Sequence, residues 1–308
     1  MNMHLEILRH DGPARLGKLH FNSHTFQTPS LLWNTAAGDA PEGYLKISPP
    51  TTAGVDDETL TEYGTIFSQT NIDGFGILPS FPTGFNTPLD IACEAVTETL
   101  NVADTHPGFG AVLEGGKYLE LRAEAVEHLA DRPIVKVAQA DRLVKNHRKL
   151  VEVLTEARDI LSPNTAIYMP GVPPHLFAVL AYMGVDLFDL RLAVLGAHEG
   201  RYLTLRGTFN ESELVELPCP CSVCVSRDGV DLDFDLLLRH NLWVSIAGVR
   251  EIRTALRQGN FRNLVEERAA CDINAIGALR LLDTVKAGFL EKHTPVSPIY
   301  SRTNFGGR

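Results

Sequence analysis

Three cysteines and a histidine have the residue types and spacing of a metal site. Cys219, Cys221 and Cys224 fall within six residues, and His240 follows sixteen positions after the last of them. The C-x-C-x-x-C spacing folds back as a knuckle that turns three thiolates toward one point, and the imidazole supplies a fourth ligand. The set completes a closed tetrahedral zinc site, which is structural because no position stays open for water. The alternative, three small buried hydrophobic residues beside a loop histidine, leaves three neighbouring thiols open to oxidation. We therefore predict one structural Zn²⁺ per chain.

Two carboxylates follow predicted strands and could do chemistry. Asp189 ends the strand of residues 186–190, and a carboxylate at the carboxyl end of a barrel strand points into the mouth of the barrel. There it could act as a nucleophile or a general base, with a helix N-cap or loop aspartate as the alternative. Glu114 has an equivalent place before Gly115 and Gly116, whose missing side chains let a flat ligand approach the backbone. A surface salt bridge is the alternative for Glu114.

Met169 ends a third predicted strand, at residues 166–169. Its polarizable thioether could lie on an aromatic ring, which makes it a candidate substrate-binding residue. Ordinary core packing is the alternative, and for a single methionine it is the more common role.

Strands and helices alternate through the middle of the chain. Short strands surround a turn at Asp11 and Gly12, and one helix is predicted over residues 89–102. Further strands are predicted at 112–113, 134–138, 166–169 and 186–190, with helices at 119–129, 144–161 and 174–183. This alternation is typical of βα units on a parallel sheet. We expect an α/β fold, one (β/α)8 TIM-type barrel over residues 1–308, with residues 205–260 as a small zinc-binding insert.

The composition is that of a soluble globular protein. Hydrophobic residues make up 44% and charged residues 21% of the 308 residues, enough to bury a sizeable core. The opening residues lack a secretory signal, and no apolar run reaches the length of a membrane span. Five cysteines, two of them without an evident partner, suit a reducing compartment, so we expect a cytoplasmic protein with no membrane attachment.

The charge of the chain leaves a nucleic-acid partner open. A net charge of −10 argues against binding by bulk attraction. A local basic patch is available after His240, formed by Arg250, Arg253, Arg257, Arg262 and Arg268. A solvated helix face is an equally good interpretation of these arginines, and composition does not separate the two.

Residues 111–265 resemble the catalytic half of the tRNA-guanine transglycosylases, barrel enzymes that exchange a guanine in tRNA for a 7-deazaguanine base. Four stretches carry the resemblance in the family's order. Residues 112–122 resemble the V-Q-G-G-x-x-x-x-L-R segment, and residues 169–189 resemble the ungapped run from M-G-V to G-x-D-M-F-D. Residues 200–204 resemble the stretch before the zinc knuckle, and residues 219–241 resemble the C-x-C-x-x-C…H-N signature.

The resemblance implies a role for each candidate residue. Asp189 would be the nucleophile that attacks the anomeric carbon of the ribose, expels guanine and holds the sugar as a covalent intermediate. Met169 would stack on the base, and Glu114, Gly115 and Gly116 would contact it. Glu114 replaces a family glutamine, and an ionised carboxylate accepts hydrogen bonds but donates none. The target nucleotide would be unpaired or flipped to reach this pocket. Zinc would hold the insert against the barrel and support a dimer.

Three departures indicate a divergent member rather than an orthodox queuine enzyme. The family's second aspartate, a general acid/base in an F-D-E/Q-C-like segment, has no counterpart between residues 70 and 110, where Asp90 and Asp104 are the stand-ins. The Gly-Gly that follows the next strand in queuine-type enzymes is replaced by Val-Ala-Gln at 137–139. Residues 33–35, Trp-Asn-Thr, stand where a P-V-G-T-like loop is expected.

Three functions remain open. The first is an active transglycosylase that exchanges guanine for a 7-deazaguanine in tRNA, the favoured polymer, or in DNA, as a homodimer or heterodimer. The second is a non-catalytic accessory subunit that pairs with an active relative. The third is a barrel reused for other chemistry on a modified base. The missing second aspartate favours the accessory subunit, whereas the spacing from Met169 to Asp189 favours the enzyme.

Overall fold

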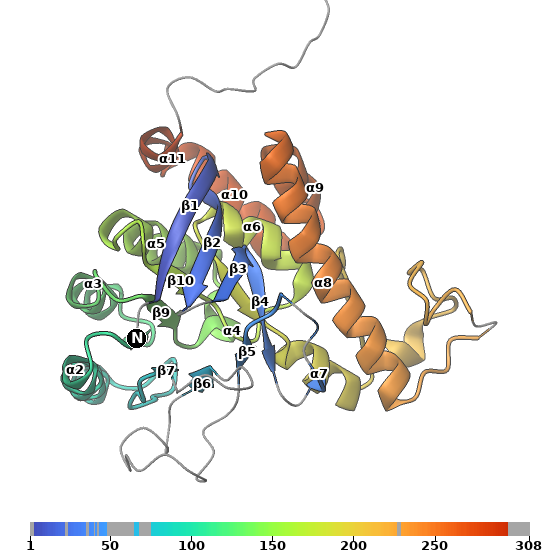
Figure 1. Cartoon of the computed structure of the whole chain (residues 1–308), viewed down its shortest axis with the longest axis horizontal. Coiled ribbons are helices and arrows are strands. Elements are labelled where there is room, and N and C mark those ends of the chain that lie inside the picture. Colours follow the sequence, from blue (N-terminus) through green and yellow to red (C-terminus); the bar gives the residue numbers. More distant parts are fainter. Residues whose placement is uncertain are drawn as a thin grey trace, which may run out of the picture.

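A parallel sheet forms the centre of the protein (Figure 1). The computed structural model describes residues 3–21, 24–34, 37–39, 41, 43–47, 65–67, 75–226 and 229–294. Six strands lie in the order β5 (Lys46–Ile47), β4 (Ser30–Asn34), β11 (Leu187–Asp189), β10 (Ala166–Tyr168), β9 (Ile134–Val137) and β8 (Ala111–Leu113). Each of these neighbouring pairs is parallel. The carboxyl ends of the strands therefore lie at one edge, where side chains from separate strands can meet.

The sheet continues and curls beyond these six strands. A parallel bridge between Ile77 and Gly110 joins β7 (Phe75–Ile77) to β8, and β6 (Thr65–Phe67) pairs with β7 in the antiparallel sense. β6 also contacts β5 at the opposite edge of the sheet. The pairings between described residues give an α/β fold with a curled, mainly parallel sheet, and they do not join eight parallel strands into the expected closed barrel. Thr35, in the loop that departs from the family pattern, lies outside the described residues.

Helices cover the outside of the sheet. They are α2 (Leu89–Thr105), α3 (Leu119–His128), α4 (Ala140–Leu143), α5 (His147–Ile160), η2 (Pro174–Leu176), α6 (Phe177–Tyr182) and α7 (Arg191–His198). α2, α3 and α5 lie side by side along one flank (Figure 1). α5 forms because its apolar residues recur at helical spacing and bury one face of the helix. The predicted alternation of strands and helices is confirmed through this part of the chain.

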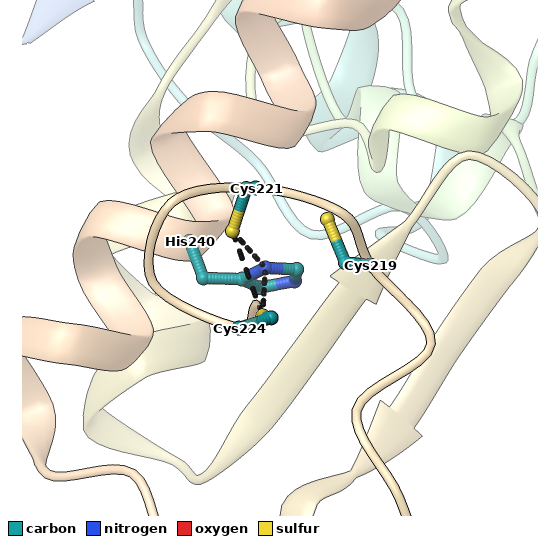
Figure 2. A group of neighbouring side chains, drawn as sticks. All are labelled: Cys219, Cys221, Cys224 and His240. Atoms are coloured by element: carbon teal, nitrogen blue, oxygen red, sulfur yellow. Dashed lines mark hydrogen bonds between the residues drawn. The ribbon is translucent and has the colours of Figure 1, made fainter. Parts of the chain in front are cut away.

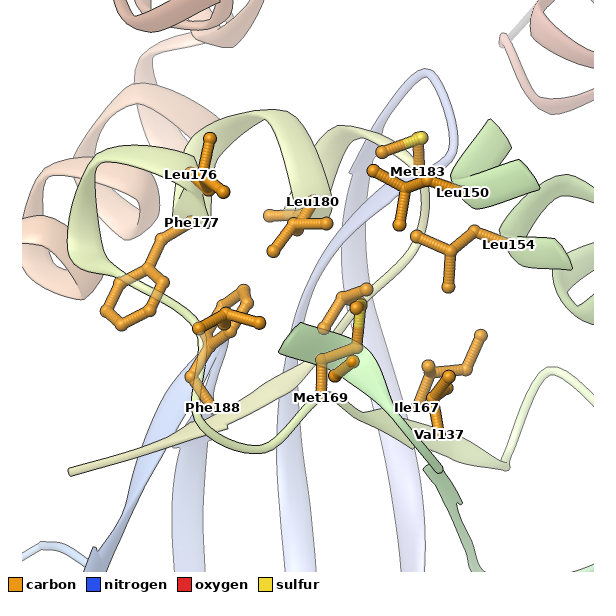
Figure 3. Packing of buried hydrophobic residues seen from close by; sticks show 14 of the residues in the cluster. Val137, Leu150, Leu154, Ile167, Met169, Leu176, Phe177, Leu180, Met183 and Phe188 are labelled. Atoms are coloured by element: carbon orange, nitrogen blue, oxygen red, sulfur yellow. The ribbon is translucent and has the colours of Figure 1, made fainter. Parts of the chain in front are cut away.

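Successive residues of each central strand point to opposite sides of the sheet. Ile167, Met169 and Phe188 face the helices and pack in the cluster beneath α6 (Figure 3). Tyr168 and Leu187 belong to the other cluster, inside the curl of the sheet. Alternate residues therefore line the interior, and the residues between them fill the core under the helices.

An antiparallel sheet covers the amino ends of the parallel strands. It consists of β1 (Met3–Asp11), β2 (Ala14–Phe21) and β3 (His24–Thr28). Apolar side chains of these strands share the interior cluster with Ile134, Ala166 and Leu187, the first residues of three parallel strands. The expected short strands at the start of the chain thus close the floor of the sheet.

A buried ion pair fixes this floor. Arg15 of β2 pairs with Asp186, and it also donates to the carbonyl oxygens of Pro163 (2.7 Å) and Thr165 (2.9 Å). A carboxylate oxygen of Asp186 accepts the backbone N–H of Ile167 at 2.9 Å. The pair therefore joins β2 to the residues that begin β10 and β11.

A long helix links the metal-site region to the main core. α8 (Phe234–Gln258) carries His240 in its first half, whereas Val249 and Ile252 in its second half pack in the core under the helices. It ends at Gly259, whose φ of +71° is typical of the glycine that follows a helix. The expected insert of residues 205–260 thus contains a helix that is shared with the core, and its boundaries stay a prediction.

The remaining elements flank α8. β12 (Arg201–Thr204) and β13 (Gly207–Asn210) form a hairpin before it, with the short η3 (Glu211–Glu213), and α9 (Phe261–Ala269), α10 (Ile273–Thr284) and α11 (Ala287–His293) follow it. Each helix in the described part of the chain is too short or too polar to cross a bilayer.

Candidate active site and metal site

The four residues of the predicted zinc site lie together near the start of α8. Each of Cys219, Cys221, Cys224 and His240 offers one ligand atom, and these atoms all lie within 4.8 Å of one another (Figure 2). The Sγ atoms of Cys221 and Cys224 are 3.5 Å apart, and Nδ1 of His240 is 3.5 and 3.3 Å from them. A tetrahedral site with Zn–S bonds of about 2.3 Å has ligand–ligand distances of roughly 3.8 Å. The cluster can therefore hold one metal ion.

The surroundings of His240 prepare it to bind a metal. Its Nε2 donates to the carbonyl oxygen of Leu203 at 2.8 Å, which leaves the lone pair of Nδ1 facing the sulfurs. Burial lowers the pKa of His240 to about 4, so the ring is neutral at physiological pH. Tyr202 stacks on the imidazole with ring centroids 3.8 Å apart. Burial raises the pKa of Cys224 to about 12, so a nearby positive charge such as a metal ion is needed to ionise this thiol.

A cavity of about 690 Å³ opens at the carboxyl ends of the parallel strands. Residues of β8 and β9, of the loops after β8, β9 and β10, and of α7 line it, among them Glu114, Lys136, Gln139, Gly171 and Arg191. Small-molecule pockets have volumes of about 300–1,000 Å³, so a nucleobase with its sugar fits this space.

Glu114 lies in this cavity and is buried. Its Oε1 accepts the hydroxyl of Ser80 at 3.0 Å, and its Oε2 accepts the side-chain amide of Gln139 at 3.0 Å. Gln139 is itself held by Arg122, whose Nη2 donates to the amide oxygen at 2.8 Å. Burial raises the pKa of Glu114 and lowers that of Arg122 to about 10. The carboxylate is thus fixed by the protein and its charge is poorly solvated, which distinguishes it from a surface salt bridge.

Gly115 and Gly116 pack against the protein rather than the cavity. Their φ angles are +132° and +56°, and neither residue lines the cavity. A Cβ atom on Gly115 would lie 2.7 Å from Cγ of Arg122, and one on Gly116 would lie 3.1 Å from the carbonyl oxygen of Phe85. The glycines serve a turn and close internal packing, and their expected contact with a ligand stays a prediction.

Asp189 ends β11 at the same edge of the sheet. Its Oδ2 accepts the hydroxyl of Tyr168 at 2.7 Å, and its Oδ1 accepts the backbone N–H groups of Gly171 (2.9 Å) and Arg191 (3.2 Å). The side chain of Asp189 is 1% exposed and lies directly behind Gly171 and Arg191, which line the cavity. Burial, and next the charge of Asp189, raise the pKa of Tyr168, so the phenol stays protonated and donates. Asp189 is therefore an ordered carboxylate at the wall of the cavity.

Met169 lies on the face of the sheet opposite the cavity. It is fully buried beside Ile167 and Phe188 (Figure 3). Because Tyr168 points inward, its neighbour in the chain points outward to the helices. The structure shows Met169 packed in the core, its alternative role, and the expected stacking on a base stays a prediction.

Two residues of the cavity escaped the sequence analysis. Lys136 is the one charged residue of β9 and its side chain lines the cavity. A single charge in an otherwise apolar strand is the signal that could have revealed it. His175 also lines the cavity, and its Nδ1 is buried without a hydrogen-bond partner among the described residues. Burial lowers the pKa of His175, and its position in a proline-rich loop carries no recognisable pattern.

The two aspartates considered as a general acid/base lie away from the cavity. Asp90 is exposed in the first turn of α2. Asp104, near the end of the same helix, pairs with His128 at 2.8 Å and with Arg132 at 3.3 Å. Neither aspartate lines the cavity, so neither contacts a base bound there.

The five arginines after His240 do not form one basic patch. Arg253 is buried and donates to a backbone carbonyl oxygen, and Arg257 donates to a side-chain amide. Arg262 and Arg268 form ion pairs with acidic neighbours. Arg250 lines a separate groove between α8 and α9. Most of this charge is used within the protein.

Comparison with known proteins identifies relatives of the chain. A family model described as queuine tRNA-ribosyltransferase matches residues 89–271, more than half of the chain. The tRNA-guanine(15) transglycosylase of Methanosarcina mazei is 32% identical over 195 residues, which cover 60% of this chain and 40% of the relative. The protein of the same name from Haloferax volcanii is 30% identical over 266 residues, 77% of this chain and 51% of the relative. A third, from Methanobrevibacter smithii, is 31% identical over 224 residues, 68% of this chain and 34% of the relative.

The chain spans between 34% and 51% of the length of these relatives. The matched range includes β8 to β11, which carry Glu114 and Asp189, and the Cys/His cluster at the start of α8. The chain belongs to the queuine tRNA-ribosyltransferase family, the tRNA-guanine transglycosylases.

Proposed function

We propose that the protein exchanges a guanine in tRNA for a 7-deazaguanine base through a covalent aspartyl-ribose intermediate. The observation that carries this proposal is that Glu114, directly after β8, lines the cavity, while Asp189, at the end of β11, is hydrogen-bonded to Gly171 and Arg191, which line the same cavity. Relatives named tRNA-guanine(15) transglycosylase support a guanine of tRNA as the substrate.

Asp189 would act as the nucleophile. In the first displacement, one carboxylate oxygen bonds to the anomeric carbon while the bond from that carbon to guanine breaks and its electron pair leaves with the base. The hydroxyl of Tyr168 and the N–H of Gly171 hold the carboxylate in one orientation. The side chain of Arg191, 3.9 Å from Asp189 and 54% exposed, would turn away from the carboxylate as the sugar enters. In the second displacement the incoming base attacks the same carbon and releases Asp189, so the configuration at the sugar is retained.

Glu114 would recognise the base. An ionised carboxylate accepts two hydrogen bonds, and guanine offers a ring N–H and an amino group along one edge. Ser80 and Gln139 fix the two oxygens of Glu114. A 7-deazaguanine presents the same edge, so the leaving and incoming bases can occupy one site.

The metal site would hold a structural Zn²⁺. The donor set of three sulfurs and one imidazole, with Nδ1 of His240 turned toward the sulfurs, fits zinc. The ion would join the loop of residues 219–224 to α8.

A closed barrel and a dimer belong to the same proposal, and the contact of β6 with β5 supports the closure of the barrel.

A non-catalytic accessory subunit is the second candidate function. The observation that favours it is the burial of the Asp189 carboxylate, which three hydrogen bonds hold behind Arg191. Such a subunit would bind tRNA or an active relative without exchanging a base itself.

Incubation with radiolabelled guanine and either tRNA or duplex DNA tests the proposal. We expect label in tRNA with the wild-type protein and none with Asp189→Asn, together with a covalent protein–tRNA adduct that also depends on Asp189. The exposed Asp131 supplies a control, since Asp131→Asn should exchange base at the wild-type rate. Label in DNA alone would mean that the substrate is DNA rather than tRNA. Exchange by Asp189→Asn would refute the nucleophile, and no exchange from folded, zinc-loaded wild type would favour the accessory subunit.

A further inference from the structure

Lys136 stands on the strand between the two carboxylates of the cavity. In the register of the sheet it pairs with Val112 of β8 on one side and with Tyr168 of β10 on the other. Glu114 follows Val112 by two residues and so shares its face, and the hydroxyl of Tyr168 donates to Asp189. Lys136 therefore faces the same interior as both carboxylates.

The ammonium group of Lys136 is available to a ligand. Its side chain lines the cavity, and among the described residues it makes neither a hydrogen bond nor an ion pair. Burial, and next the charge of Arg191, lower the pKa of Lys136, and the charges of Glu114 and Asp189 oppose this change without reversing it. A lysine whose pKa is lowered gives up its proton more readily than a fully solvated lysine.

Base exchange needs a group that gives a proton in one step and takes a proton in the next. The departing guanine leaves with an electron pair and needs a proton, and the incoming base must lose the proton of the nitrogen that will carry the sugar. Other titratable residues line the cavity but lie in helices and loops beyond the strands: Asp141, Lys145, His175 and Asp272. A base with its recognised edge at Glu114 and its sugar at Asp189 extends past β9, where Lys136 is the side chain that meets it.

We propose that Lys136 is the proton carrier of the exchange: its ammonium group protonates the departing guanine, and its amine then accepts the proton of the incoming base. This inference rests on the proposed function, and it supplies the general acid/base for which the sequence offers no family aspartate.

Both steps balance in atoms and charge. In the first, Asp189 bonds to the anomeric carbon, the carbon–nitrogen bond breaks, and the nitrogen that carried the sugar takes a proton from Lys136. Neutral guanine leaves, and Lys136 is a neutral amine. In the second, that amine removes the proton from the same nitrogen of the incoming base, the nitrogen bonds to the anomeric carbon, and Asp189 is released. Lys136 ends as an ammonium group and no other reactant is needed.

The two steps require opposite forms of Lys136. The kcat/KM for tRNA reports the free enzyme, which needs the ammonium form, so it falls as the pH rises through the pKa of Lys136. The kcat/KM for the incoming base reports the covalent intermediate, which needs the amine, so it falls as the pH drops through that pKa. The charged or titratable groups that face Lys136 are Glu114 directly after β8, Tyr168 on β10, Asp189 on β11 and Arg191 on α7.

Three variants of Lys136 separate proton transfer from charge alone. Lys136→Met removes both, and we expect base exchange to fall by about 10²–10⁴-fold, the usual contribution of general acid–base catalysis. Lys136→Arg keeps the positive charge but holds its proton at neutral pH, so a loss of similar size is expected. Lys136→Ala leaves space for a small amine, and added methylamine should restore part of the rate. The matched control is Lys292→Met, an exposed lysine on α11 that should exchange base normally.

Each outcome decides between the proposals. Four results together would support the inference. The wild-type protein exchanges base, Lys136→Met and Lys136→Arg are inactive, and methylamine restores part of the activity of Lys136→Ala. The residual kcat/KM of the variants for tRNA no longer falls at high pH. Full activity of Lys136→Arg would overturn it, because charge alone would then suffice, and full activity of Lys136→Met would overturn it too, because another group would then carry the proton. Absence of exchange by the wild-type protein would overturn the proposed function together with this inference. Circular dichroism and thermal unfolding of every variant separate a lost fold from a lost proton carrier.

Discussion

Side chains at the cavity are held by hydrogen bonds that cross from strand to strand. Gln139 has a φ of +52°, a conformation that favours glycine, and it lies in the segment that replaces the Gly-Gly of queuine-type enzymes. Its amide joins Arg122 to Glu114. Gln139 thus has a backbone conformation suited to glycine, while its side chain orients the carboxylate.

Tyr168→Phe tests, also at the scale of single residues, whether the hydroxyl of Tyr168 positions Asp189, the proposed nucleophile. The change removes the hydroxyl that donates to Asp189 and keeps the ring in place. A buried hydrogen bond to a charged group contributes about 1.5–3 kcal/mol, so we expect the free energy of unfolding in urea to fall by that amount. We also expect kcat to fall by up to about 10²-fold, because the carboxylate is less firmly oriented. The control Tyr182→Phe removes a hydroxyl that accepts from Arg262, far from Asp189, and should change stability without changing kcat. An unchanged kcat in Tyr168→Phe would mean that this contact does not position Asp189.

At the scale of elements, the strands and helices between residues 111 and 190 could be predicted, because each has a clear apolar pattern and is bounded by glycine, proline or polar residues. The face that each strand residue takes could not. Both faces of a covered parallel strand are apolar, so Tyr168 and Met169 look alike in the sequence although one packs in the interior of the curled sheet and the other faces the helices. The contacts of Gly115 with Arg122 could not be predicted from the sequence either, because they depend on how α3 packs against the loop before it.

Two aspartates three residues apart, Asp186 and Asp189, illustrate how one strand divides structural and chemical roles. Asp186→Ala would leave Arg15 buried without its partner, and we expect a loss of about 3–5 kcal/mol of unfolding free energy. The double variant Arg15→Met/Asp186→Leu should recover most of it, because no unpaired charge remains. Urea denaturation followed by circular dichroism measures both. If Asp186→Ala is as stable as the wild type, the ion pair does not fix the floor of the sheet.

At the scale of the whole molecule, the cavity and the metal site are parts of one folded unit joined by α8. The cluster of three cysteines and one histidine could be predicted from spacing alone, because its members are local in sequence apart from His240. The cavity is assembled from strands far apart in the chain, so its electrostatics depend on contacts such as that of Lys136 with its neighbouring strands, which no single motif encodes.

Removal of the metal should destabilise the region around residues 219–240 before the rest of the folded chain. Purified protein should contain about one zinc per chain, and Cys221→Ser should lose it and lower the melting temperature, since the binding energy of a structural zinc is folding energy. Hydrogen exchange should then rise in residues 219–240 more than in the second half of α8, whose apolar side chains are buried in the core. Cys93→Ser is the matched control, because Cys93 is exposed on α2 and should leave the zinc content unchanged. Full zinc occupancy in Cys221→Ser would refute the ligand set.

The shared helix also makes the protein vulnerable to oxidants at a distance from its substrate. α8 has 25 residues and is about 38 Å long. Toward its far end, Arg253 donates to the carbonyl oxygen of Pro29 at 2.8 Å, and the strand that begins at Ser30 pairs with the strand of Asp189. Damage to one of the cysteine thiols would release the near end of this helix, and the displacement would reach the strand of Asp189, the proposed nucleophile. We expect peroxide to inactivate the protein while every side chain of the cavity remains chemically intact.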